Sequence, residues 1–186
     1  IYSGRCRTLT QNERQFLSQT RLPAKRIAVD NTCTSFVDRY YGLQQCTLAH
    51  VCGDFIIRRA DGNFAYQLAV VVDDAETGVT EVVRGNDLLP STHQQLFLYE
   101  KLGFCPPQFF HIPLLLDADG RRLSKRNKDT DMDILRQRFS PQELIGYIMQ
   151  LCGFTEHSFA LSLDEALAMF SCKKMPKFLK NSIIYR

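Results

Sequence analysis

The feature that most constrains the fold is a strand, a helix and a second strand that follow one another in residues 79–116. Val79–Val83 alternates apolar and polar residues, as a half-buried strand does. Ser91–Gln94 predicts a capping box, and a helix of about three turns follows it and ends at Gly103. The apolar run Phe109–Leu116 predicts a buried strand. A β-α-β unit implies a right-handed crossover in a parallel sheet, which is half of a nucleotide-binding α/β fold.

A basic, hydroxyl-bearing loop follows the second strand, with the sequence Gly120-Arg121-Arg122-Leu123-Ser124-Lys125-Arg126-Asn127. Ligands of open α/β sheets lie at the carboxyl ends of the strands, and clustered Lys and Arg suit phosphate oxygens. The loop therefore predicts a site that handles pyrophosphate. On composition alone the alternative is a solvated basic loop, because charged side chains are common on protein surfaces.

The segment Leu123–Arg126 resembles the second signature of class I aminoacyl-tRNA synthetases, in the variant of members that activate glutamate. Three upstream blocks resemble the same family in the same order, namely Gly53–Gly62, Ala65–Asp74 and Gly78–Leu89. The chain is therefore similar to the class I glutamyl-tRNA synthetase-like family. The fold that this implies is α/β: the second half of a Rossmann-type parallel-sheet domain, with a small β-rich insertion and a carboxy-terminal helical subdomain.

The resemblance implies ATP-dependent activation of glutamate, with Mg²⁺ accompanying ATP and a tRNA as acceptor. Lys125, together with Ser124 and Arg126, would bind ATP and stabilise the charge that grows on its phosphates. Tyr66 and Arg84 would bind glutamate through a phenol and a guanidinium. We expect Arg84 and Lys125 to face one cavity. Without the resemblance, Arg84 would be expected to be an exposed arginine at a strand end.

Two branches of this family differ in length and in acceptor. Glutamyl-tRNA synthetases continue into a large anticodon-binding region, whereas shorter relatives transfer glutamate to the queuosine base of tRNA(Asp). The sequence ends at Arg186, soon after the expected helical segment, which favours transfer to queuosine. A glutamyl-tRNA synthetase fragment without its anticodon-binding domain and a non-catalytic RNA-binding relative stay open. The first class I signature is absent from the sequence, so we expect this chain alone to be inactive.

Tyr2 and Cys6 near the start of the chain are candidate metal ligands. In the family that the chain resembles, an upstream Cys-x-Cys pair joins such a tyrosine and cysteine in a structural Zn²⁺ site. That pair is absent here, so Tyr2 and Cys6 would supply half of a tetrahedral site. The alternative is a buried free cysteine.

The resemblance also implies a division into three parts. Residues 1–52 would hold the zinc-site remnant and the acceptor-binding insertion, residues 53–127 the second half of the catalytic domain, and residues 128–186 a helical subdomain that contacts tRNA. In the first part, a half-exposed strand is predicted from Ser35, and Tyr40 and Tyr41 either stack on bases or pack into the small core of the insertion.

Further local elements are predicted beside these. Ser140–Glu143 and Ser162–Glu165 indicate two capped helices. Tyr66–Asp74 is assigned as a helix from the resemblance, although three consecutive valines favour a strand. His93 is expected on a helix surface. His111 either lines the adenosine pocket or is a structural histidine.

Composition limits the setting in which the chain works. Its 186 residues are 45% hydrophobic, which suffices for a core. The sequence contains no apolar run near 20 residues and no cleavable signal, so neither a membrane span nor export is expected. Seven scattered cysteines indicate a reducing, cytoplasmic setting. The net charge of +3 is mild, so nucleic-acid binding would rest on local patches. A monomer is expected.

Overall fold

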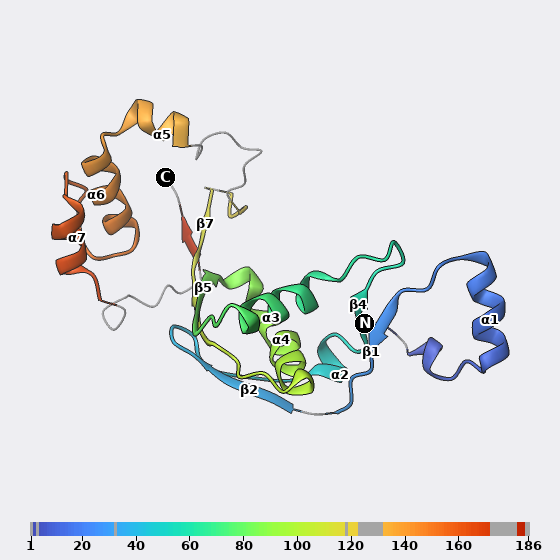
Figure 1. Ribbon diagram of the computed structural model, residues 1–186. Coiled ribbons are helices and arrows are strands. Elements are labelled where there is room, and N and C mark those ends of the chain that lie inside the picture. The colour runs from blue at the N-terminus through green and yellow to red at the C-terminus, as the bar shows by residue number, and fades with distance from the viewer. Residues whose placement is uncertain are drawn as a thin grey trace. The chain divides into compact units, whose positions relative to one another are not determined.

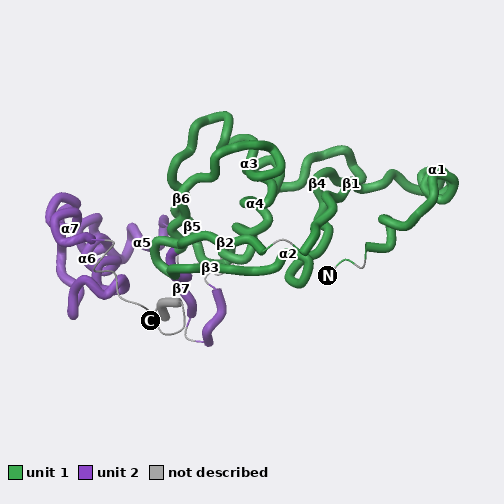
Figure 2. Tube along the Cα trace, turned by 90° about the horizontal axis from the view of Figure 1, so that it is seen from below, with its two compact units in different colours: residues 1–111 green, residues 112–186 purple. Residues whose placement is uncertain are grey.

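The structure is a computed structural model, which describes residues 2, 4–31, 33–117, 119–122 and 132–171 and the backbone of 182–184 (Figure 1). It divides into two compact units, residues 1–111 and 112–186 (Figure 2). None of the helices in the described part has the length and apolar character needed to cross a membrane. The division of the sequence at residues 52 and 127 is a division by function, and it stays a prediction.

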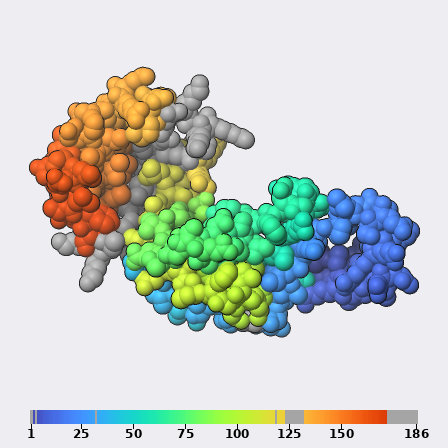
Figure 3. All heavy atoms as spheres, viewed as in Figure 1, coloured from blue at the N-terminus to red at the C-terminus, as the bar shows by residue number. Residues whose placement is uncertain are grey.

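The first unit begins with a short 3-10 helix η1 (Arg5–Arg7) and an exposed helix α1 (Gln11–Thr20). Helix α1 starts with a capping box between Thr10 and Glu13, and all of its residues are exposed. The space-filling view shows one face of this blue segment (Figure 3). Strand β1 (Lys25–Ile27) follows and pairs antiparallel with β4 (Phe55–Arg58).

Between β1 and β4 lies a hairpin of β2 (Cys33–Asp38) and β3 (Gly42–Thr47), followed by the short helix α2 (Leu48–Val51). The register runs from Cys33 opposite Thr47 to Asp38 opposite Gly42. Gly42 has a φ of 73°, in the left-handed region that the turn needs. Tyr40 is buried in this turn, as predicted for at least one of the two tyrosines.

The predicted strand, helix and strand are present as β5 (Glu81–Gly85), α4 (Leu89–Leu102) and β6 (Gln108–Ile112). Strands β5 and β6 are hydrogen-bonded neighbours, and a 3-10 turn η2 (Asn86–Leu88) joins β5 to α4. Helix α3 (Tyr66–Glu76) precedes β5 and packs on α4, so the helix assignment is confirmed.

The prediction for the start of α4 is wrong. The helix begins at Leu89 and not after a cap at Ser91–Gln94, because η2 already turns the chain and Pro90 fits the first helical turn. The hydroxyl of Thr92 donates to the carbonyl of Leu88 at 3.2 Å, as a threonine inside a helix does. The predicted end at Gly103 is confirmed, with a φ of 71°.

His93 is buried, whereas the sequence predicted a surface position. Its Nδ1 lies 2.8 Å from the hydroxyl of Thr34 on β2. Burial lowers the pKa of His93.

The apolar core of the first unit is formed by side chains of α2, α3, α4 and β4 and of the segment after β1. They are Val29, Leu48, Phe55, Val71, Phe97, Leu98 and Tyr99.

The described part of the second unit contains the parallel strands β7 (Leu114–Leu116) and β8 (Ser182–Ile184) and the helices α5 (Met132–Arg138), α6 (Pro141–Leu151) and α7 (Leu163–Met169). Both predicted capping boxes, at Ser140 and Ser162, are confirmed. The run Phe109–Leu116 is two strands and not one, because Pro113 has no N–H to donate to a ladder and separates β6 from β7.

Candidate functional site

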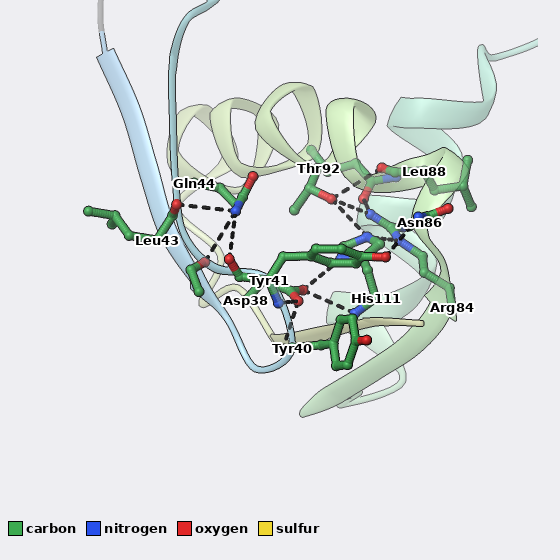
Figure 4. A network of polar contacts seen from close by, with 12 residues as sticks. Asp38, Tyr40, Tyr41, Leu43, Gln44, Arg84, Asn86, Leu88, Thr92 and His111 are labelled. Atoms are coloured by element: carbon green, nitrogen blue, oxygen red, sulfur yellow. Dashed lines mark hydrogen bonds and ion pairs between the residues drawn. The ribbon is translucent and has the colours of Figure 1, made fainter. Parts of the chain in front are cut away.

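Arg84 is at the centre of a polar network in the first unit, near the carboxyl end of β5 and half-buried. Its Nε donates to Nε2 of His111 at 2.9 Å. Its Nη2 donates to the hydroxyl of Thr92 and to Oε1 of Gln95, both at 2.8 Å (Figure 4). Thr92 and Gln95 are three residues apart on α4, so they lie on the same face of the helix.

The three groups that accept hydrogen bonds from Arg84 are an imidazole, a hydroxyl and an amide, and none of them carries a negative charge. Among the residues that the structure describes, no carboxylate forms an ion pair with Arg84. Burial lowers the pKa of Arg84, and Tyr66, Asp74, Tyr99 and Asp38 act in the opposite direction from longer range. A half-buried guanidinium without a carboxylate partner is a site for an anion.

The free donors of Arg84 lie on one nitrogen. A guanidinium has five N–H donors, and three of them point to His111, Thr92 and Gln95. The remaining two are both on Nη1, for which no partner occurs in the described part of the chain. The guanidinium carbon lies 5.1 Å from the ring centroid of Phe109, which restricts it further. These contacts therefore hold Nη1 of Arg84 in a fixed position, and whether it binds a ligand stays a prediction.

Asp38 and His111 support Arg84 from β2 and β6. His111 is fully buried, and its Nδ1 lies 2.7 Å from Oδ2 of Asp38. The same oxygen accepts the backbone N–H of His111 at 3.0 Å, while Oδ1 accepts the N–H groups of Tyr40 and Tyr41 at 2.9 and 2.8 Å. Burial alone would raise the pKa of Asp38, but the hydrogen bonds outweigh it and hold the pKa below its usual value.

Tyr66 is the first residue of α3, and its side chain is exposed. It lies near enough to Arg84 to influence the pKa of the guanidinium. The next residue, Gln67, accepts a hydrogen bond from Nε2 of Gln95 at 2.8 Å and so ties the start of α3 to the Arg84 network. The structure thus brings together the two residues predicted to bind glutamate, while their role as ligands stays a prediction.

Comparison with known proteins decides the family. The model of the family described as tRNA synthetases class I (E and Q), catalytic domain, matches residues 1–180. The chain belongs to this family. Membership confirms the recognition made from the four sequence blocks.

Three of the curated relatives share one name. This chain is 42% identical over 177 residues to the glutamyl-Q tRNA(Asp) synthetase of Nitratidesulfovibrio vulgaris, with 94% of this chain and 55% of the relative covered. The protein of that name from Verminephrobacter eiseniae is 49% identical over 128 residues, which are 68% of this chain and 43% of the relative. The one from Neisseria gonorrhoeae is 40% identical over 177 residues, 95% and 59% of the two chains. The synthetase chain thus spans about half the length of these relatives.

A solved structure supports the fold. The crystal structure of a glutamate tRNA ligase from Elizabethkingia meningosepticum in complex with its amino acid aligns with all of this chain and 41% of its own, with a TM-score of 0.77 and 24% sequence identity. The crystal structure of the glutamate-tRNA synthetase of Elizabethkingia anophelis aligns with the same TM-score, and the alignment covers 42% of that synthetase's chain. The predicted class I α/β fold is therefore confirmed.

Tyr2 and Cys6 lie close together, because the backbone N–H of Cys6 donates to the Tyr2 hydroxyl at 2.8 Å. The guanidinium of Arg26 lies over the Tyr2 ring, 4.1 Å from its centroid. Within the described part of the synthetase chain, no group of three or more His, Cys, Asp or Glu residues is placed to hold a metal. These residues do not complete a Zn²⁺ site, and zinc binding stays a prediction.

The predicted ATP-binding residues Ser124, Lys125 and Arg126 lie outside the described residues. The expectation that Arg84 and Lys125 face one cavity therefore stays a prediction. His111, one of whose alternatives was the adenosine pocket, is fully buried and bonded to Asp38 and Arg84, which is the structural alternative.

The sequence alone did not identify three members of the network, which are Asp38, Thr92 and Gln95. One signal was available for Thr92 and Gln95, since their spacing of three puts them on the same helix face. For Asp38 the sequence offered only an acid at a strand end, and such residues are common in turns.

Proposed function

We propose that this protein activates glutamate with ATP and transfers the glutamyl group to the queuosine base of tRNA(Asp). In the first step, the α-carboxylate of glutamate attacks the α-phosphate of ATP, and pyrophosphate leaves. In the second, a nucleophile of the queuosine base takes the glutamyl group, and AMP leaves. The curated relatives named for this activity support the choice of acceptor.

Arg84 carries the proposal for the amino acid. Its charge is half-buried, its hydrogen-bond partners among the described residues are all neutral, and both N–H groups of Nη1 are without a partner there and available for the side-chain carboxylate of glutamate. Tyr66, on the neighbouring helix, would donate its phenolic hydrogen to the same substrate. Glutamine brings no negative charge to this guanidinium, so its binding is expected to be weaker by about 2 to 5 kcal/mol.

Lys125, with Ser124 and Arg126, would act on the ATP side. An ammonium near the leaving pyrophosphate stabilises the charge that develops as the bond to the α-phosphate breaks, a contribution of roughly 3 kcal/mol or more. Mg²⁺ would accompany ATP, as it does for nucleoside triphosphates generally. The resemblance of Leu123–Arg126 to the second class I signature supports these roles.

The test is ATP–pyrophosphate exchange by the full-length protein with glutamate, glutamine and aspartate, with and without tRNA, followed by charging of tRNA(Asp) and tRNA(Glu) with labelled glutamate. Of the three amino acids, we expect only glutamate to support exchange. We also expect charging of tRNA(Asp) that requires queuosine. Charging of tRNA(Glu) would instead indicate a glutamyl-tRNA synthetase. Absence of exchange under every condition would indicate the non-catalytic RNA-binding alternative.

A further inference from the structure

We infer that Asp38 is a positioning residue for amino-acid recognition, which acts on Arg84 through His111. The inference rests on the proposed role of Arg84 in binding glutamate. Asp38 is the last residue of β2, where the β2–β3 hairpin begins to turn, and His111 is on β6 (Figure 4). The hairpin thus reaches the arginine through one buried imidazole.

The hydrogen bonds of His111 allow a single tautomer. An imidazolium has no acceptor, so the hydrogen bond from Nε of Arg84 to Nε2 of His111 requires a neutral ring with the proton on Nδ1. The Nδ1 proton points to Oδ2 of Asp38, at 2.7 Å. Asp38 therefore holds the tautomer whose other nitrogen accepts from Arg84.

The position of His111 in turn fixes which donors Arg84 offers. With Nε bonded to His111 and Nη2 bonded to Thr92 and Gln95, Nη1 is the nitrogen that the described residues leave for the substrate. If Nε2 of His111 carried the proton, that proton could point to the hydroxyl of Thr92, 3.2 Å away, but Nε of Arg84 would lose its acceptor and face a donor. A correctly oriented guanidinium binds a carboxylate more tightly, because less order is lost on binding.

Asp38→Asn is the direct perturbation, because four N–H donors surround the carboxylate and an amide presents one NH₂ group to them. Placed toward Tyr40 and Tyr41, the NH₂ would meet two backbone N–H groups. Placed toward His111, it would meet one backbone N–H and the Nδ1 atom, which can become an acceptor if the ring proton moves to Nε2. The second placement has fewer conflicts and gives the wrong tautomer, as the same change does in catalytic triads.

The experiment measures the KM for glutamate, the KM for ATP and kcat of the full-length protein by pyrophosphate exchange, and the tautomer of His111 by ¹⁵N NMR of labelled histidine. For Asp38→Asn we expect a glutamate KM roughly 10- to 100-fold higher, as for the loss of one charge-assisted hydrogen bond. The KM for ATP should stay within about twofold. The ¹⁵N shifts should move from the Nδ1–H to the Nε2–H pattern. An unchanged tautomer, or equal rises in both KM values, would overturn the inference.

Substitutions of His111 give a second and independent test. The amide of glutamine reaches the place of Nε2 and can accept from Arg84, whereas the amide of asparagine reaches only the place of Nδ1. We expect His111→Asn to raise the glutamate KM as Asp38→Asn does, and His111→Gln to raise it several-fold less. Equal effects of the two amides would contradict a role for the contact with Arg84.

Asp54→Asn is the matched control. Asp54 is a buried carboxylate of the same unit, but it bonds to Arg7 and the N–H of Val29, away from Arg84. It should lower stability without changing the KM for glutamate. Arg84→Gln separates the two proposals: if it leaves the glutamate KM unchanged, the proposed function fails, and if it raises that KM while Asp38→Asn does not, only the positioning role fails.

Discussion

Replacement of Arg84 tests the anion site most directly, and the structure gives the size of the effect. In Arg84→Lys the charge remains, but a single ammonium with three donors replaces a fork with five. It cannot satisfy the buried groups of Thr92, Gln95 and His111 and a substrate carboxylate together. One or two buried acceptors are then left unpaired, at about 1 to 3 kcal/mol each. We expect kcat/KM for glutamate to fall by about 2 to 4 kcal/mol, roughly 30- to 1,000-fold.

Arg84→Gln removes the charge as well and should act on specificity. The preference for glutamate over glutamine depends on the cation, so it should persist in Arg84→Lys and fall below about 1 kcal/mol in Arg84→Gln. The assay is pyrophosphate exchange with each amino acid titrated in turn in the presence of tRNA(Asp). If both variants keep the wild-type ratio, Arg84 does not bind the side-chain carboxylate.

Arg39→Gln is the control on the same unit. Arg39 pairs with Glu81 at 2.7 Å, with both side chains about half exposed, and Glu81 lies on β5 as Arg84 does. Exposed pairs of this kind contribute less than about 1 kcal/mol. This variant should therefore keep wild-type kcat/KM for glutamate. A large loss would show that removing the ion pair with Glu81 on β5 disturbs activity without any change to the guanidinium of Arg84.

Three further predictions concern stability and the neutral surroundings of the site arginine. The pKa of Asp54 is lowered mainly by the hydrogen bond from Arg7, so its contribution to stability is present above the unfolded-state pKa of about 3.9 and is lost as the pH falls through the lower folded-state pKa. Asp54→Asn should flatten the acid limb of urea midpoints measured against pH, and an equally steep limb would count against this. Gly146→Ala should lower the thermal midpoint measured by circular dichroism, with a cost of about 2 kcal/mol or more, because its Cβ would lie 1.7 Å from the carbonyl oxygen of Phe159; an unchanged midpoint would contradict the packing. Gln95→Glu would place a carboxylate where the amide oxygen of Gln95 now accepts from Arg84. This carboxylate would compete with the substrate for the guanidinium, so the glutamate KM should rise at least about tenfold while the urea midpoint is kept. An unchanged KM would refute competition for the charge of Arg84.

Local signals predicted the elements that depend on adjacent residues. The capping boxes at Ser140 and Ser162 and the glycine end of α4 were correct, since each is satisfied within a few residues of the chain. The box predicted at Ser91–Gln94 was wrong because the preceding turn η2 had already started the helix. His93 was misplaced because its burial depends on the distant hairpin residue Thr34, which no local pattern shows.

The candidate site divides in the same way. Tyr66 and Arg84 were named from the family resemblance, which carries information about ligands that composition and periodicity lack. Asp38 could not be identified, because its partner His111 lies 73 residues further along the chain. The sequence shows an aspartate but not whether it is buried and accepts hydrogen bonds from four N–H groups or is solvated in a turn. Only the fold distinguishes these two situations.

Two arginines of the first unit show how the surroundings separate a structural cation from one that is available to a ligand. Arg7 donates through Nε and Nη2 to the carboxylate of Asp54, so its charge is already compensated and the pair links the start of the chain to the segment before β4. Arg84 is held by neutral acceptors, so its orientation is fixed while no carboxylate of the described residues pairs with its charge. The carboxylate of Asp38 is bonded to His111 and not to Arg84, so it acts on the orientation of the guanidinium through the imidazole. To select glutamate over glutamine, a guanidinium must be held in a fixed orientation without being paired to a carboxylate of the protein. A guanidinium that is already paired would gain little binding energy from the carboxylate of glutamate or from the amide of glutamine, so it could not distinguish them.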